Sequence, residues 1–284
     1  MVYSLSGDAE ILVLHNWPNE ISLSSWLELC QKLLLKLKLK LNLFAWGEIQ
    51  EGTSRLKTRR RTGRAVNFRV AYKLAPTIDV NTTLANVACA NLGSRHPTEE
   101  WKFYSEFSRA REYFKPSSVS VCFDKELLGD VKMLDVLLLA YQVFRPAYGY
   151  ILDCQGGQLA QGFAHGIPVP ALDPDLCSDE RLSETSLVNW QLNRKRLVDE
   201  PHFLRDVFSV NLLTKTQVFA KFLYRNEAKT IATLGIGELY NVPESNEAYI
   251  WKLDDEDVWR SRDILKRAGR LLAADVDSMN EVSE

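Results

Sequence analysis

The sequence holds little of what metal and redox sites need. It has 5 cysteines and 4 histidines in 284 residues, and no two cysteines form a Cys-x-x-Cys pair. No histidine has a second histidine or a cysteine at metal-ligand spacing, which excludes the sequence motifs of zinc fingers and zinc proteases. The cysteines are odd in number and far apart, as is typical of buried free thiols in a reducing compartment. We therefore expect no metal and no other cofactor.

Phosphate-binding motifs, hydrolase motifs and long hydrophobic runs are also missing. The sequence contains no Gly-x-x-x-x-Gly-Lys, no Gly-x-Gly-x-x-Gly and no Gly-x-Ser-x-Gly. The most apolar segment, Met133–Phe144, is too short to cross a membrane and carries Asp135. The first residues lack the basic region and apolar core of a secretory signal. We expect a cytoplasmic protein without a membrane partner.

A local concentration of positive charge is the strongest feature that is present. The chain as a whole is nearly neutral, with 35 basic and 37 acidic residues and a net charge of -2. A protein that coats DNA would be strongly positive throughout. In this chain the positive charge is instead concentrated in one segment. Six basic residues lie between positions 55 and 64, and we call them the basic cluster: Arg55, Lys57, Arg59, Arg60, Arg61 and Arg64.

The cluster lies in a segment whose pattern predicts a β-hairpin at residues 54–72. Thr62-Gly63 has turn composition, and apolar and polar residues alternate after it up to Tyr72. Three interpretations remain open. The basic cluster binds an acidic protein surface, it binds the phosphates of a nucleic acid, or its charges keep a sheet edge from pairing with other strands.

The rest of the chain alternates predicted strands and helices. This pattern predicts an α+β fold, with mixed or antiparallel sheets covered by helices and with two similar halves. In the N-terminal half we expect strands at 10–15, 41–49, 118–123 and 148–152, and helices at 25–36, 81–91, 97–114 and 130–144. In the C-terminal half we expect strands at 206–213, 237–242 and 248–253, and helices at 179–195, 214–223 and 254–273.

A segment rich in glycine and proline, residues 154–180, separates the two halves. It suggests an N-terminal unit of residues 1–153 and a C-terminal unit of residues 181–284, although a single domain is an open alternative. Cys154 and His165 lie in this segment. A thiol-dependent enzyme would need such a pair in contact, whereas the simpler interpretation is a cysteine at the end of a strand.

Two segments carry a family resemblance that covers about residues 118–273. After the predicted helix the chain reads Pro-Ala-Tyr-Gly-Tyr at 146–150, and residues 204–214 read Leu-Arg-Asp-Val-Phe-Ser-Val-Asn-Leu-Leu-Thr. This layout resembles the immunity-like proteins associated with type VI secretion, in which a Val-Asn-Trp-Leu-Thr-like segment follows a glycine-containing strand. Leu212 stands where that pattern has Trp. The resemblance implies a cytosolic α+β protein that neutralises a toxin by binding it, and it implies no catalytic residues.

Together these observations predict a non-enzymatic protein-binding protein that acts through the basic cluster on an acidic partner. A nucleic-acid-binding accessory protein is the first alternative, and a thiol-dependent enzyme is the second.

Overall fold

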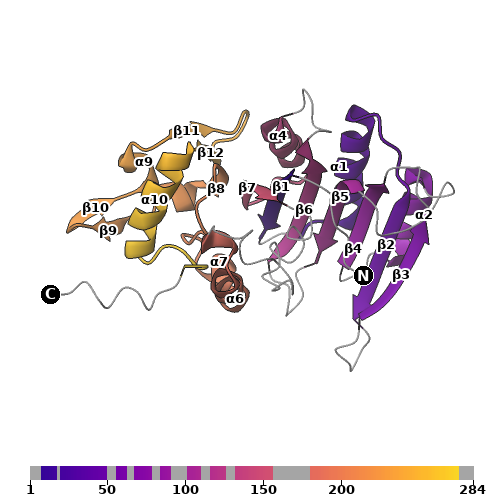
Figure 1. Ribbon diagram of the computed structural model, residues 1–284, viewed down its shortest axis with the longest axis horizontal. Helices are drawn as coiled ribbons and strands as arrows, with labels where there is room; N and C mark the ends of the chain where they lie inside the picture. Colours follow the sequence, from indigo (N-terminus) through magenta and orange to yellow (C-terminus); the bar gives the residue numbers. More distant parts are fainter. Residues whose placement is uncertain are drawn as a thin grey trace. The chain divides into compact units, whose positions relative to one another are not determined.

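The computed structural model describes residues 8–17, 20–49, 56–62, 67–78, 84–90, 101–109, 116–125, 132–155 and 180–274. Helices and mostly antiparallel sheets give the chain an α+β fold, which confirms the predicted class (Figure 1). The chain divides into two compact units. Unit 1 consists of Met1–Pro146 with Asp153–Gln161, and unit 2 consists of Ala147–Leu152 with Gly162–Glu284.

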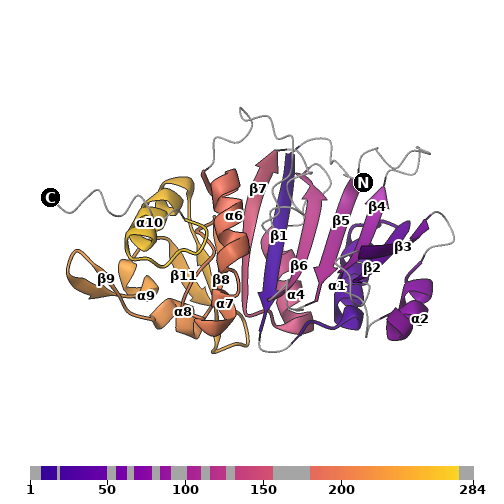
Figure 2. The ribbon, with the colours of Figure 1, turned by 90° about the horizontal axis from the view of Figure 1, so that it is seen from below.

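The sheet of unit 1 runs in the order β1-β6-β5-β4-β2-β3, and all its neighbouring strands are antiparallel (Figure 2). The strands β1, β6 and β5 lie at one end of this order, and β3 is the last strand at the other end. The strands are β1 (Asp8–Asn16), β2 (Leu43–Ile49), β3 (Leu56–Thr62), β4 (Leu84–Ala90), β5 (Trp101–Ser108) and β6 (Ser117–Asp124).

Three helices of unit 1 are described, and α1 (Leu23–Lys36) contacts both of the others, α2 (Phe68–Ile78) and α4 (Met133–Phe144). The helix α1 begins where the Ser22 side chain accepts a hydrogen bond from the Ser25 N–H at 3.0 Å. Its apolar stripe is buried, and the Trp26 Nε1–H donates to Ser105 Oγ of β5 at 2.9 Å. That hydrogen bond fixes α1 on one face of the sheet.

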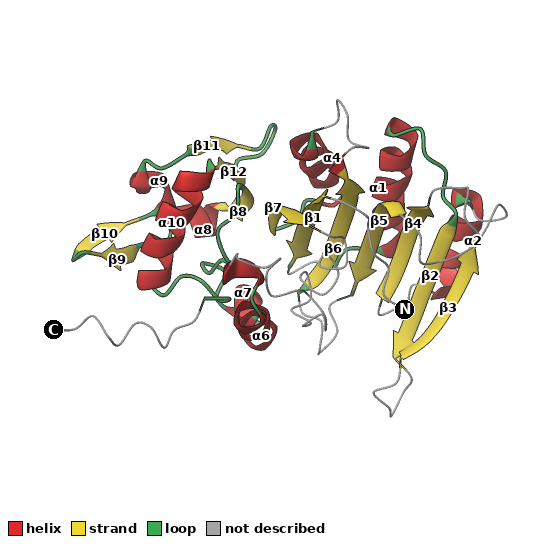
Figure 3. Cartoon of the chain, viewed as in Figure 1, coloured by secondary structure: helices red, strands yellow, loops and turns green. Residues whose placement is uncertain are grey.

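Within unit 2 the strands run in the antiparallel order β11-β12-β8-β7, and β9 and β10 form a separate two-stranded sheet (Figure 3). The first strand of unit 2 is β7, of which the residues up to Leu152 belong to this unit. The strands are β7 (Tyr148–Gln155), β8 (Val210–Thr214), β9 (Phe222–Tyr224), β10 (Glu227–Lys229), β11 (Glu238–Asn241) and β12 (Ala248–Lys252). The helices are η2 (Glu180–Leu182), α6 (Glu184–Asn193), α7 (Arg196–Asp199), α8 (Lys215–Phe219), α9 (Ile231–Leu234) and α10 (Asp255–Arg267).

Several predicted elements are confirmed. The strand, helix and strand expected between residues 118 and 152 are β6, α4 and β7, and the paired strands near the C-terminus are β11 and β12. The helix expected from residue 254 is α10, and the Asp254 side chain caps it by accepting a hydrogen bond from the Asp257 N–H at 2.8 Å. Among the described residues, no helix is both long enough and apolar enough to cross a membrane.

The prediction of a strand for the second arm of the hairpin is wrong. Residues 68–78 form α2, and β3 pairs with the preceding strand β2. The alternation that suggested a strand also satisfies a helix. Ala71 and Ala75, four residues apart, are both buried, and the rings of Phe68 and Tyr72 lie 6.3 Å apart. A helix can bury both alanines on one stripe, and this local pattern outweighs the period of two.

The two helices predicted at residues 81–91 and 97–114 are also wrong, because β4 and β5 occupy these stretches. In β5 every residue from Phe103 to Ser108 is buried, so both faces of the strand are covered. Such a strand shows no alternation in sequence, and its aromatic residues fell by chance at helical spacing. The ring of Phe103 instead packs edge-on against Phe123 of β6, with centroids 5.2 Å apart.

Candidate partner-binding surface and buried charge network

The basic cluster lies largely on β3, the last strand in the sheet of unit 1. Its register with β2 places Arg59 opposite Trp46, Arg60 opposite Ala45, and Arg61 opposite Phe44. Arg59 is exposed. Arg55 and Arg64 lie outside the described residues.

The β2 strand gives β3 an apolar neighbour. Phe44 is fully buried and Trp46 is 6% exposed, and their rings lie 5.3 Å apart. Residues 43–47 of β2 are buried, and none of them is acidic. The one acidic residue that β2 sets opposite the basic cluster is Glu48, which faces Lys57 in the register. The three arginines of β3 therefore have no carboxylate opposite them in β2.

The residues of the suggested thiol site are only partly described. Cys154 lies in β7, and His165 lies outside the described residues. No group of three or more His, Cys, Asp or Glu that could hold a metal ion occurs in the part of the chain that the structure describes. The thiol-enzyme hypothesis thus stays a prediction.

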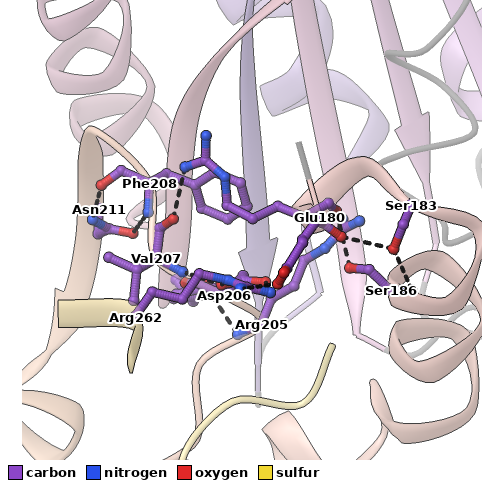
Figure 4. A network of polar contacts seen from close by, with 11 residues as sticks. Glu180, Ser183, Ser186, Arg205, Asp206, Val207, Phe208, Asn211 and Arg262 are labelled. Atoms are coloured by element: carbon purple, nitrogen blue, oxygen red, sulfur yellow. Dashed lines mark hydrogen bonds and ion pairs between the residues drawn. The ribbon is translucent and has the colours of Figure 1, made fainter. Parts of the chain in front are cut away.

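A buried charge network in unit 2 is the feature that the sequence did not predict (Figure 4). Arg262 of α10 binds Asp206 with two hydrogen bonds, Nε to Oδ1 at 2.8 Å and Nη2 to Oδ2 at 3.3 Å. Its Nη1 reaches Glu180 Oε2 at 2.7 Å. The side chains of Asp206 and Arg262 are 1% and 7% exposed, whereas Glu180 is 68% exposed. The arginine thus joins a buried carboxylate to one at the surface.

Burial and ion pairing act in opposite directions on this pair. Burial raises the pKa of Asp206, while the positive charge of Arg262 and the Val207 N–H at 2.9 Å work against that rise. Burial alone would lower the pKa of Arg262, but the carboxylates of Asp206 and Glu180 outweigh it and raise the pKa. The arginine stays charged and holds three segments of unit 2 together.

Arg205, the neighbour of Asp206 in sequence, is fully buried among aromatic rings. Its Nη1 donates to Tyr150 Oη at 2.6 Å, and its backbone N–H donates to Tyr148 Oη at 3.1 Å. The guanidinium carbon also lies 5.0 Å from the centroid of the Trp190 ring. Strand β7 and helix α6 of unit 2 therefore meet at one arginine.

The tyrosines around Arg205 are hydrogen-bonding groups rather than bases. Burial raises the pKa of Tyr150 to about 12, although Arg205 works against the rise. Burial raises the pKa of Tyr148 further still. Both phenols stay protonated at neutral pH, so they can orient Arg205 but cannot remove protons from a substrate. The geometry favours a structural role for this network.

One exposed aromatic residue adds a second surface that sequence reasoning missed. Trp259 of α10 is 43% exposed, and the guanidinium carbons of Arg181 and Arg262 lie 5.0 Å and 5.6 Å from its ring centroid. Tryptophan with neighbouring arginines is typical of the residues that dominate protein interfaces. The sequence did contain a signal for this exposure. Trp259 follows the buried Val258 directly, and so it lies outside the apolar stripe of α10.

Comparison with solved structures gives a distant likeness. No protein-family model matches the chain, and no curated protein matches it. A solved structure, described as a Pseudomonas aeruginosa type VI secretion system protein, matches with a TM-score of 0.49 and 9% sequence identity. The match covers 95% of this chain and 74% of that one. A likeness this low assigns no function.

Proposed function

We propose that this chain is a non-enzymatic, immunity-like protein that neutralises a toxin or effector by binding an acidic surface of it. The observation that supports the proposal is the concentration of basic residues on a strand at the edge of a sheet, where Arg59 is exposed. Charged residues at such a surface steer an oppositely charged partner and select it against others.

The basic residues of β3 are the binding residues in this proposal. Arg59 is exposed, and the register with β2 sets the apolar residues Phe44 and Trp46, not carboxylates, opposite Arg61 and Arg59. An acidic partner would supply that charge. The resemblance of residues 118–273 to immunity-like proteins favours a toxin or effector as the partner.

Capture of the tagged full chain from its native cell lysate tests the proposal. Wild type is compared with the triple variant R59E/R60E/R61E and with a matched control, K36E/K132E/K221E, which makes the same charge change at exposed lysines. We expect a protein to be retained by wild type and by the control after nuclease treatment. The triple variant should bind this protein at least about tenfold more weakly, and salt should weaken the wild-type complex.

Two outcomes contradict the proposal. If nuclease treatment removes everything that is captured, the chain is instead a nucleic-acid-binding accessory protein, and affinity for nucleic acid will fall steeply with salt. If the triple variant retains the protein as well as the control does, the basic cluster is not the binding surface.

A further inference from the structure

The strand β11 forms an edge of unit 2. It stands last in the strand order of the described residues, beside β12, and the side chains of Glu238, Tyr240 and Asn241 on it are exposed. Its one charged side chain, Glu238, forms an ion pair with Lys252 of β12 at 3.7 Å. The strand contains neither lysine nor proline, the residues that commonly keep an edge from pairing.

The hydrogen bonds of the β11–β12 pair show which backbone groups face outward. Val242, directly after β11, donates its N–H to the Ala248 carbonyl oxygen at 2.9 Å, so these opposed residues form a hydrogen-bonded pair. Such pairs alternate along an antiparallel ladder. Leu239 and Asn241 therefore direct their N–H and C=O groups away from β12. Within the described part of the chain these outward groups take part in no hydrogen bond.

One face of β11 continues a buried apolar row. The register places Tyr240 beside Ile250 of β12, and Ile250 beside Leu212 of β8. Ile250 and Leu212 are fully buried, whereas Tyr240 at the end of the row is 37% exposed. Covering this ring would extend the row and remove more apolar area from water.

The backbone of a second β11 matches this edge. A twofold axis through Tyr240 sets Leu239 of each copy opposite Asn241 of the other. These are two hydrogen-bonded pairs with two bonds each, so every outward N–H and C=O of Leu239 and Asn241 finds a partner. The two Tyr240 side chains form the central pair, which is the closer, non-hydrogen-bonded kind and favours contact between aromatic rings.

The charges of β11 also permit a second copy. Glu238 lies opposite Val242 of the other copy, and the two Glu238 residues are separated by about 14 Å along the strands. No like charges therefore meet across the axis. A charged guest strand gains no ion pair here, because Lys252 already binds the one carboxylate of β11.

We infer that β11 pairs with β11 of a second copy of this chain and forms a twofold dimer whose two sheets are continuous. Backbone pairing supplies the direction and register, and the paired Tyr240 rings bury the end of the apolar row. This inference does not depend on the proposed function, since β11 belongs to unit 2 and the basic cluster belongs to unit 1.

Sedimentation equilibrium of the purified full chain over a range of concentrations tests the dimer. We expect the mass to rise from that of one chain toward that of two. Y240K should raise the dimer Kd about tenfold, because two lysines would face each other in place of two rings. N241P should also weaken the dimer, since it removes an outward N–H and no bond to β12. The matched control is Y224K, the same change at a half-buried tyrosine of β9, which should leave the Kd unchanged.

Disulfide formation tests the register. Y240C places two thiols in the central pair, and we expect mild oxidation to join the copies. E238C introduces a thiol at an exposed position of the same strand, but the two thiols would be too far apart to form a disulfide. Wild type, with its 5 native cysteines, gives the background.

A chain that stays monomeric at every concentration would overturn the inference. So would a dimer that Y240K and N241P leave as stable as Y224K does, or cross-linking of E238C as fast as that of Y240C. Circular dichroism checks that Y240K is folded, and N241P and Y240C test the same surface if it is not. None of these outcomes bears on capture of a partner by the basic cluster, so the two proposals fail separately.

Discussion

At the scale of single residues, the Asp206–Arg262 pair shows how charge is accommodated inside unit 2. A buried ion pair of this kind adds little net stability compared with apolar residues, but the loss of one partner leaves an uncompensated charge. The pair is bidentate and nearly inaccessible to solvent. Its contribution is therefore most visible when one member is removed.

D206N should destabilise the protein by about 3–5 kcal/mol, because Arg262 would remain buried without its carboxylate. The matched control is E180Q, which removes the exposed partner of the same arginine and should cost below about 1 kcal/mol. Urea denaturation gives both free energies of unfolding. Equal losses for the two variants would mean that the buried pair is not the dominant contact of Arg262.

At the scale of elements, the junction between β11 and β12 depends on one glycine. Gly237 precedes β11 and has a φ of +68°. A Cβ added there would overlap the Lys252 carbonyl oxygen and a methyl group of Leu253. Gly235, two residues earlier, has a φ of +63° and nothing within 4 Å of the same added atom.

G237A should therefore destabilise the protein more than G235A. Both variants introduce the strain of a left-handed alanine, about 1 kcal/mol, so the difference between them isolates the overlap with the backbone of β12. Thermal unfolding of the two variants measures this difference. If both melt at the same temperature, β11 can shift away from β12 without cost.

The elements also show where sequence patterns succeed. The caps of α1 and α10, Ser22 and Asp254, are local signals, and the structure uses both. The pattern fails at β5, because the helix α1 that packs on one of its faces and the strands β4 and β6 beside it reach it only after folding. It fails at α2 because Phe68 and Tyr72 satisfy the periods of both a strand and a helix.

At the scale of the whole molecule, neither compact unit is one continuous segment of the chain. Segment Ala147–Leu152 belongs to unit 2, although residues on both sides of it belong to unit 1. This segment carries Tyr148 and Tyr150, which hydrogen-bond to Arg205. Unit 2 is therefore incomplete without it.

Two fragments test this dependence. A fragment of residues 147–284 should unfold cooperatively in urea and show a near-ultraviolet circular dichroism signal from its packed aromatic residues. A fragment of residues 181–284 lacks β7, and we expect it to lose both the signal and the cooperative transition. Unfolding of both fragments at the same urea concentration would show that β7 is dispensable for unit 2.

The sequence by itself determined the α+β class, the main helix caps, the strand and helix order between residues 118 and 152, and the location of the basic cluster. These features depend on neighbours in sequence, through capping, periodicity and local charge. Only the tertiary structure decided that β3 ends a sheet, that β5 is a central strand, and that Asp206 meets Arg262 from 56 residues away. Such pairings join distant segments, and no local pattern specifies them because their energy is gained only when the chain has folded.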